Sequence, residues 1–188
     1  WRMEEPGDVG HLVCAPDGAY VIYSYSDNGL ENWQLALHPL APGIEGWTQT
    51  VGQMPGSLLL SPDGCTLAVV DGAHITLHGP YERGERRREP VTLPAGVHDL
   101  AFSHDGRRLA YVTKSPEVGV LDVETGRNVV EPRLFGEEVF AAAFSRDDRS
   151  LRLRTKKAVE FFSLQVSPVA PRVIKPASEL PLQQVAAD

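Results

Sequence analysis

Cysteine is scarce in this sequence, and long apolar runs are missing. The 188 residues include only Cys14 and Cys65, too few for a disulfide-stapled scaffold. We expect both to be buried, reduced thiols, with a single disulfide as the alternative. No apolar run approaches the ~18 residues that cross a bilayer, so we expect no membrane contact. The N-terminus shows no secretory signal pattern, which favours the cytoplasm. Because the chain begins with Trp1, we expect the natural start to lie upstream.

Basic residues are also in the minority. The chain has 18 Lys and Arg against 25 Asp and Glu, and its formal net charge is −7. Nucleic-acid binding needs clustered basic surface, so this balance argues against it. Two basic clusters are nevertheless present. The first is Arg83, Arg86, Arg87 and Arg88, which we expect to be a solvated loop, with a docking patch for an acidic partner as the alternative. The second, near the C-terminal end of the repeats, is Arg149, Arg152, Arg154, Lys156 and Lys157. If Arg152 and Arg154 lie on one face of a strand, a partner packed there must supply carboxylates, since a buried unpaired charge is costly.

Signatures of catalysis and of metal binding are absent as well. The sequence has no G-x-S-x-G elbow, no H-E-x-x-H and no cysteine pair at zinc spacing. His74 and His78 fall on one predicted strand, ~13 Å apart, which is too far to share an ion. His98-Asp99 and His104-Asp105 are only sequence neighbours, and a catalytic dyad requires geometry. We therefore expect no catalytic residue, metal or cofactor, and a non-enzymatic protein.

What the chain does have is turns and an internal repeat. Glycine and proline together make up 32 residues, which favours short strands over long helices. Four segments resemble one another: Leu12 to Gly18, Leu58 to Gly64, Leu100 to Gly106 and Ala142 to Asp148. Their aspartates, Asp17, Asp63, Asp105 and Asp147, are separated by 46, 42 and 42 residues. This period matches the ~40–45 residues of a four-stranded propeller blade.

Each repeat predicts four antiparallel strands. A short apolar run leads into an Asp-Gly turn, and apolar and polar residues then alternate with period two. First strands are expected near 9–14, 56–61, 97–103 and 139–145, and second strands near 19–25, 65–70, 107–113 and 149–155. Third strands are expected at 33–37, 73–78, 118–123 and 159–164, and fourth strands near 44–51, 89–93, 128–134 and 169–175. For 136–144 a helix is the alternative.

These repeats resemble the WD-repeat and TolB-like β-propeller superfamily. The resemblance depends on Ser61-Pro62-Asp63-Gly64, on Phe102-Ser103-His104-Asp105-Gly106 and on Val120-Leu121-Asp122 with Thr125-Gly126. The Trp-Asp dipeptide of the family is missing, Leu121-Asp122 standing in its place, and Asp148 replaces the turn glycine. The family's buried hydrogen-bond tetrad is therefore not expected.

The resemblance implies an all-β fold, a β-propeller of four-stranded antiparallel blades. We expect about four blades in this chain, at 1–51, 52–93, 94–134 and 135–165, followed by a proline-rich strand or tail at 166–188. Four blades can close into a small ring, be completed by other residues or another chain, or pair as two copies. We favour completion, because open edge strands invite pairing with another chain or with missing blades.

Function in propellers resides on rims and loops, so we expect a partner to bind there. The loops between second and third strands supply the predicted contacts: Tyr25, Asp27, Asn28, Glu31, Asp71, Lys114, Glu117, Lys156 and Lys157. Tyr25 and Asn28 are the strongest candidates. We expect a protein-interaction or regulatory module that binds a protein partner or other domains of the same polypeptide. The alternative is a substrate-gating or ligand-sensing propeller attached to an enzyme such as a hydrolase.

Overall fold

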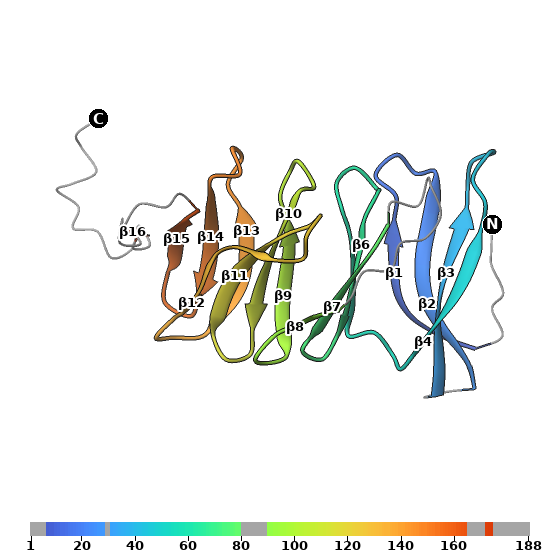
Figure 1. The fold of residues 1–188 in the computed structure, drawn as a ribbon, viewed down its shortest axis with the longest axis horizontal. Helices are drawn as coiled ribbons and strands as arrows, with labels where there is room; N and C mark the ends of the chain where they lie inside the picture. The colour runs from blue at the N-terminus through green and yellow to red at the C-terminus, as the bar shows by residue number, and fades with distance from the viewer. Residues whose placement is uncertain (1–6, 29–30, 80–89, 165–171, 175–188) are drawn as a thin grey trace. The chain divides into compact units, whose positions relative to one another are not determined.

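The computed structural model describes residues 7–28, 31–79, 90–164 and 172–174, and every regular element in these ranges is a β-strand (Figure 1). The first eight strands are β1 (Asp8–Cys14), β2 (Tyr20–Asn28), β3 (Glu31–Pro39), β4 (Trp47–Gly52), β5 (Ser57–Leu60), β6 (Leu67–Asp71), β7 (His74–His78) and β8 (Val91–Thr92). The next eight are β9 (Val97–Phe102), β10 (Arg108–Thr113), β11 (Glu117–Asp122), β12 (Asn128–Leu134), β13 (Val139–Phe144), β14 (Ser150–Thr155), β15 (Val159–Ser163) and β16 (Arg172–Ile174).

The strands form four antiparallel sheets of four strands each. Sheet 1 is β1-β2-β3-β4, sheet 2 is β5-β6-β7-β8, sheet 3 is β9-β10-β11-β12 and sheet 4 is β13-β14-β15-β16. Each sheet is made of strands that follow one another in the chain and hydrogen-bond in that same order. The all-β class and the four-strand repeat predicted from the sequence are confirmed. The helix considered for 136–144 is wrong, because β13 occupies most of that range.

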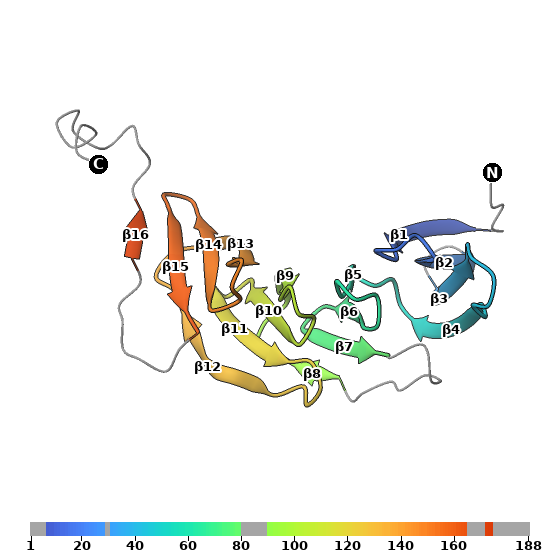
Figure 2. The same ribbon diagram turned by 90° about the horizontal axis from the view of Figure 1, so that it is seen from above.

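The chain divides into two compact units, Trp1–Val97 and His98–Asp188. The first contains sheets 1 and 2, and in it β1 lies beside β5. The second contains sheets 3 and 4, and in it β10 lies beside β13; Figure 2 gives the view from above. Each unit therefore consists of two sheets that contact each other through these strands.

The two sheets of each unit share an apolar core. In the first unit, Ile22, Leu35 and Leu37 of sheet 1 pack against Leu58, Leu67 and Val69 of sheet 2. In the second unit the core is larger and comprises Ala110, Val112, Val118, Val120, Val139, Ala142, Phe144, Leu151 and Leu153. Alternation along β14 has the predicted form: Leu151 and Leu153 are buried, whereas Arg152 and Arg154 are exposed. Burial of these apolar faces is the main contribution that holds the sheets together.

Strand β10 departs from simple alternation because both of its faces are buried. Period-two alternation places Ala110 on the same strand face as Arg108, and Leu109 and Tyr111 on the other face. Ala110 is nevertheless fully buried. The hydroxyl of Tyr111 donates to Asn128 Oδ1 at 3.2 Å, and its ring lies over Gly119 of the paired strand. A Cβ at Gly119 would overlap the Tyr111 hydroxyl, so glycine is required there for a close approach.

The structure corrects the expectation for the two cysteines and locates one strand in the proline-rich tail. Both cysteines are free, but Cys14 is exposed and Cys65 only partly covered, so the expectation of buried thiols is wrong. Cys14 is the last residue of an edge strand and lies opposite Val21, on the sheet face away from the core of its unit. In the proline-rich tail, Arg172–Ile174 pairs with β15, and the rest of 166–188 lies outside the described residues.

Candidate functional site

Four turns join the first strand of a sheet to its second strand, and three of them share a serine–aspartate arrangement. In the β9–β10 turn, Ser103 Oγ donates to Asp105 Oδ1 at 2.6 Å. The backbone N–H of Arg107 donates to the same carboxylate at 3.0 Å, and that of Arg108 donates to Ser103 Oγ at 2.9 Å. The Ser103 hydroxyl and, to a smaller extent, the Arg107 N–H stabilise the charged carboxylate and lower the pKa of Asp105.

The same contacts recur in the neighbouring turns. Ser145 Oγ donates to Asp147 Oδ1 at 2.7 Å in the β13–β14 turn, and this bond is the largest cause of the lowered pKa of Asp147. In the β5–β6 turn, Ser61 and Asp63 form the equivalent bond at 2.5 Å. The sequence repeat is therefore a repeat of turn chemistry, in which the serine and the aspartate satisfy backbone donors.

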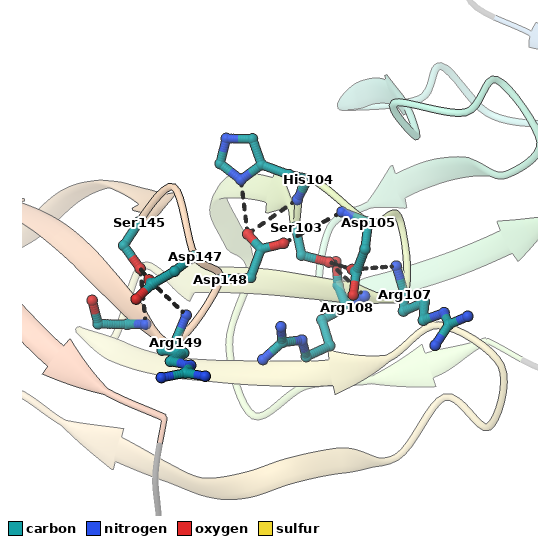
Figure 3. Close-up of polar contacts among 10 residues, drawn as sticks. Ser103, His104, Asp105, Arg107, Arg108, Ser145, Asp147, Asp148 and Arg149 are labelled. Atoms are coloured by element: carbon teal, nitrogen blue, oxygen red, sulfur yellow. Dashed lines mark hydrogen bonds and ion pairs between the residues drawn. The ribbon is translucent and has the colours of Figure 1, made fainter.

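Asp148 links the two sheets of the second unit (Figure 3). Its Oδ1 accepts from the backbone N–H of His104 at 3.1 Å and lies 2.8 Å from His104 Nδ1. Its Oδ2 accepts from the backbone N–H of Asp105 at 3.3 Å. Asp148 has a positive φ of 56°, the conformation that glycine adopts in the other three turns. The residue that looked like a degenerate turn glycine thus joins sheet 4 to the turn of sheet 3.

The pairing of His104 with Asp148 was not predicted, since the sequence suggested only its neighbour Asp105. The imidazole is 61% exposed, and in Figure 3 it points away from the hydroxyls of Ser103 and Ser145. Those hydroxyls each donate to the aspartate of their own turn. Neither of these two serines is therefore aligned as a nucleophile for the pair, whose geometry fits a contact between sheets.

The predicted rim residues lie at hairpins of their own units. In the first unit, Tyr25 is half-buried and its hydroxyl donates to Gln34 Oε1 at 3.2 Å, while Asp71 accepts from the amide of Gln53. Asp27, Asn28 and Glu31 belong to the β2–β3 hairpin, but their side chains lie outside the described part of the chain.

In the second unit, the remaining predicted residues occupy two hairpins. Lys114 and Glu117 flank the β10–β11 turn, and Lys156 and Lys157 form the tip between β14 and β15. The three lysines are exposed and Glu117 is half-buried. In Figure 1 these two hairpins lie at the same edge of their unit, opposite the β9–β10 and β13–β14 turns.

The outer face of sheet 4 carries a pattern that the rim prediction did not include. Directly opposed residues in antiparallel strands share a face, and Arg152 pairs with Phe161 while Arg154 pairs with Val159. The guanidinium of Arg152 lies 6.0 Å from the Phe161 ring centroid, and that of Arg154 lies 5.3 Å from the Phe140 ring centroid. We call these five residues the arginine–phenylalanine face.

Both arginines of this face are exposed. No carboxylate among the described residues lies within 4.0 Å of either guanidinium. From the sequence, a partner packed on this face is expected to supply carboxylates to Arg152 and Arg154. Within the chain, the two arginines contact aromatic rings. The register of β14 against β15 places Arg152 opposite Phe161.

The outer face of sheet 1 has a different composition. Val9 lies opposite Tyr25, and Leu12 lies opposite Tyr23, which lies opposite Ala36. Tyr23 and Ala36 are buried, but Val9 is 54% exposed and Leu12 is 55% exposed. We call these five residues the sheet 1 apolar face. It lies opposite the face that packs against sheet 2, and its exposed aliphatic side chains were not singled out from the sequence.

Residues 7–28, 31–79, 90–164 and 172–174 contain no cluster of three His, Cys, Asp or Glu side chains suited to a metal ion. They also contain no helix of the length and hydropathy needed to span a bilayer. No protein-family model matches the chain, and a search of curated proteins finds no significant match. A function must therefore be inferred from the chain's own surfaces.

Proposed function

We propose that this chain is a non-enzymatic interaction module, built from blades of the WD-repeat and TolB-like propeller type and working within a larger assembly. The four antiparallel meanders and the recurring serine–aspartate turns support this blade interpretation. The proposal includes a protein partner or further domains of the same polypeptide, and a cytoplasmic location.

The observation that carries the proposal is the sheet 1 apolar face. The opposite face of the same sheet contributes Ile22, Leu35 and Leu37 to a buried core against sheet 2. The apolar face has comparable chemistry, yet Val9 and Leu12 keep more than half of their surface exposed. Exposed aliphatic side chains on an edge strand favour packing against another chain. We infer that the exposed part of this face, Val9 and Leu12, packs against a second copy or another domain.

Light scattering coupled to size-exclusion chromatography tests the proposal. We expect the purified chain to self-associate as its concentration rises, because the apolar face pairs with that of a second copy in the absence of another partner. Leu12→Asp places a charge on the face and should return the chain to a monomer.

Leu134→Asp is the matched control. Leu134 is more exposed, at 69%, and belongs to β12 in the second unit, so the same substitution there should leave the association unchanged. A wild-type chain that stays monomeric and melts in one cooperative transition would contradict the proposal. Thermal melts of both variants separate loss of association from loss of folding.

A further inference from the structure

The arginine–phenylalanine face presents two oriented cations to solvent. A guanidinium stacked on a ring uses its flat face for the aromatic contact and leaves its N–H edges free. The guanidinium carbons of Arg152 and Arg154 lie over the rings of Phe161 and Phe140, at 6.0 Å and 5.3 Å from the ring centroids. Their side chains are therefore restrained before any ligand arrives, which reduces the entropy lost on binding.

The local charge of this face is opposite to that of the whole chain. The chain carries a formal net charge of −7, yet the face has two exposed arginines and no ion-paired carboxylate among the described residues. Lys156 and Lys157 are exposed at the tip of the same hairpin and add to the positive potential. A locally basic site on an acidic protein selects a ligand with closely spaced negative charge.

The contact between sheets 3 and 4 shows how the chain accommodates an arginine beside an apolar core. Between sheets 3 and 4, Arg108 lies 5.6 Å from the Phe144 ring centroid, beside a core that is otherwise apolar. On the outer face of sheet 4, by contrast, two arginines alternate along one strand. An apolar sheet packed there would bury two unpaired charges at a large cost. The occupant must therefore supply carboxylates.

We propose that the arginine–phenylalanine face binds an extended acidic segment of a partner protein, with carboxylates on alternate residues. This inference rests on the proposed interaction function and names the partner chemistry of one surface. Arg152 and Arg154 are two positions apart on a strand, so their backbone origins are ~6.8 Å apart. Side chains at alternate positions of an extended peptide have the same spacing, and each carboxylate can accept two parallel N–H bonds from one guanidinium.

Nucleic acid is the competing occupant. A long phosphate backbone needs a broad basic surface, whereas only a few cations gather here on a chain with net negative charge. The observations therefore favour a short acidic peptide, and single-stranded DNA becomes an arm of the test.

Fluorescence anisotropy measures the binding directly. The probe is a labelled peptide of alternating threonine and glutamate, and its control has glutamine at each glutamate. We expect the full chain to bind the glutamate peptide and Arg152→Ala/Arg154→Ala to bind it at least about tenfold more weakly. Arg133→Ala is the matched control, because Arg133 also stacks on a ring, that of Phe135 at 5.4 Å, but stands alone on β12. It should change the affinity less than about twofold.

A lysine variant keeps the test decisive if the alanine variant unfolds. Arg152→Lys/Arg154→Lys retains both charges but loses the planar fork, so binding should weaken by an intermediate factor. Equal binding of the glutamine peptide, no effect of either double variant, or tighter binding of single-stranded DNA would each overturn the proposal. Self-association should persist in both arginine variants, so failure here is distinguishable from failure of the sheet 1 apolar face.

Discussion

At the scale of single residues, Asp148 combines two opposing contributions to stability. Its φ of 56° is unfavourable for a residue with a Cβ, by about 1 kcal/mol. Its carboxylate accepts from two backbone N–H groups and contacts the imidazole of His104. Bonds to a charged group contribute about 1.5–3 kcal/mol when they are well covered, so the contacts outweigh the strain.

We therefore predict that Asp148→Gly lowers the free energy of unfolding by about 1–2 kcal/mol, although it relieves the backbone. Asp148→Asn should lose less, since asparagine tolerates this conformation and its Oδ1 still accepts. Asp148→Ala should be the least stable, because it keeps the strain and loses the bonds. Urea unfolding orders the three variants, and a glycine variant as stable as wild type would show that the contacts do no more than offset the backbone strain.

Gly119 provides a second test at this scale. An added Cβ would overlap the hydroxyl of Tyr111, whose side chain is 1% exposed. Gly119→Ala should therefore lower the free energy of unfolding by about 1–3 kcal/mol through overpacking. Gly136→Ala is the control, because nothing lies within 4 Å of the Cβ position there, and its effect should stay within about 0.5 kcal/mol. Denaturant melts that fail to separate the two variants would contradict this packing.

At the scale of elements, the hairpin turns make the fold sensitive to acid. Asp105 and Asp147 have folded-state pKa values below the ordinary 3.8, chiefly because Ser103 and Ser145 donate to them. A lowered pKa means that the carboxylate stabilises the fold fully above pH 3.8. That contribution is lost as the pH falls below 3.8 and passes through the folded-state pKa.

We predict that Ser103→Ala raises the pKa of Asp105 and leaves that of Asp147 unchanged, with the reverse for Ser145→Ala. Carboxyl-carbon NMR titrations of the folded chain measure both values. The variant Asp105→Asn/Asp147→Asn should also show a shallower loss of stability in urea melts as the pH falls below 3.8. Unchanged titration curves in both serine variants would show that the hydroxyls do not set these pKa values.

At the scale of the whole molecule, the chain carries two exposed surfaces of different chemistry, one in each unit. The sheet 1 apolar face depends on burial of aliphatic surface, whereas the arginine–phenylalanine face depends on charge. Salt screens exposed charges and leaves apolar association intact or strengthens it.

Raising the salt concentration from about 0.05 M to about 0.5 M should therefore weaken acidic-peptide binding at least about tenfold while self-association persists. Anisotropy and light scattering on the same samples give the two readouts. If salt weakened peptide binding and self-association to the same extent, the two surfaces would depend on the same kind of interaction, which would contradict this prediction.

Much of the local structure could be predicted from the sequence alone. The repeat of 46, 42 and 42 residues located the strands in the described part of the chain, and the three Asp-Gly turns placed the first hairpin of sheets 1, 2 and 3. These features depend on neighbours close in the chain, namely turn residues and period-two alternation. The same information placed Leu151 and Leu153 on one side of β14 and the two arginines on the other.

Only the tertiary structure decided which of these sides was covered and by what. Asp148 reaches His104 across 44 residues, and Arg152 meets Phe161 because of strand register. The exposure of Cys14 and Leu12 follows from the face that sheet 1 turns toward sheet 2. Alternation separates the two faces of a strand, but it does not say which face meets another sheet, because that contact joins residues far apart in the chain.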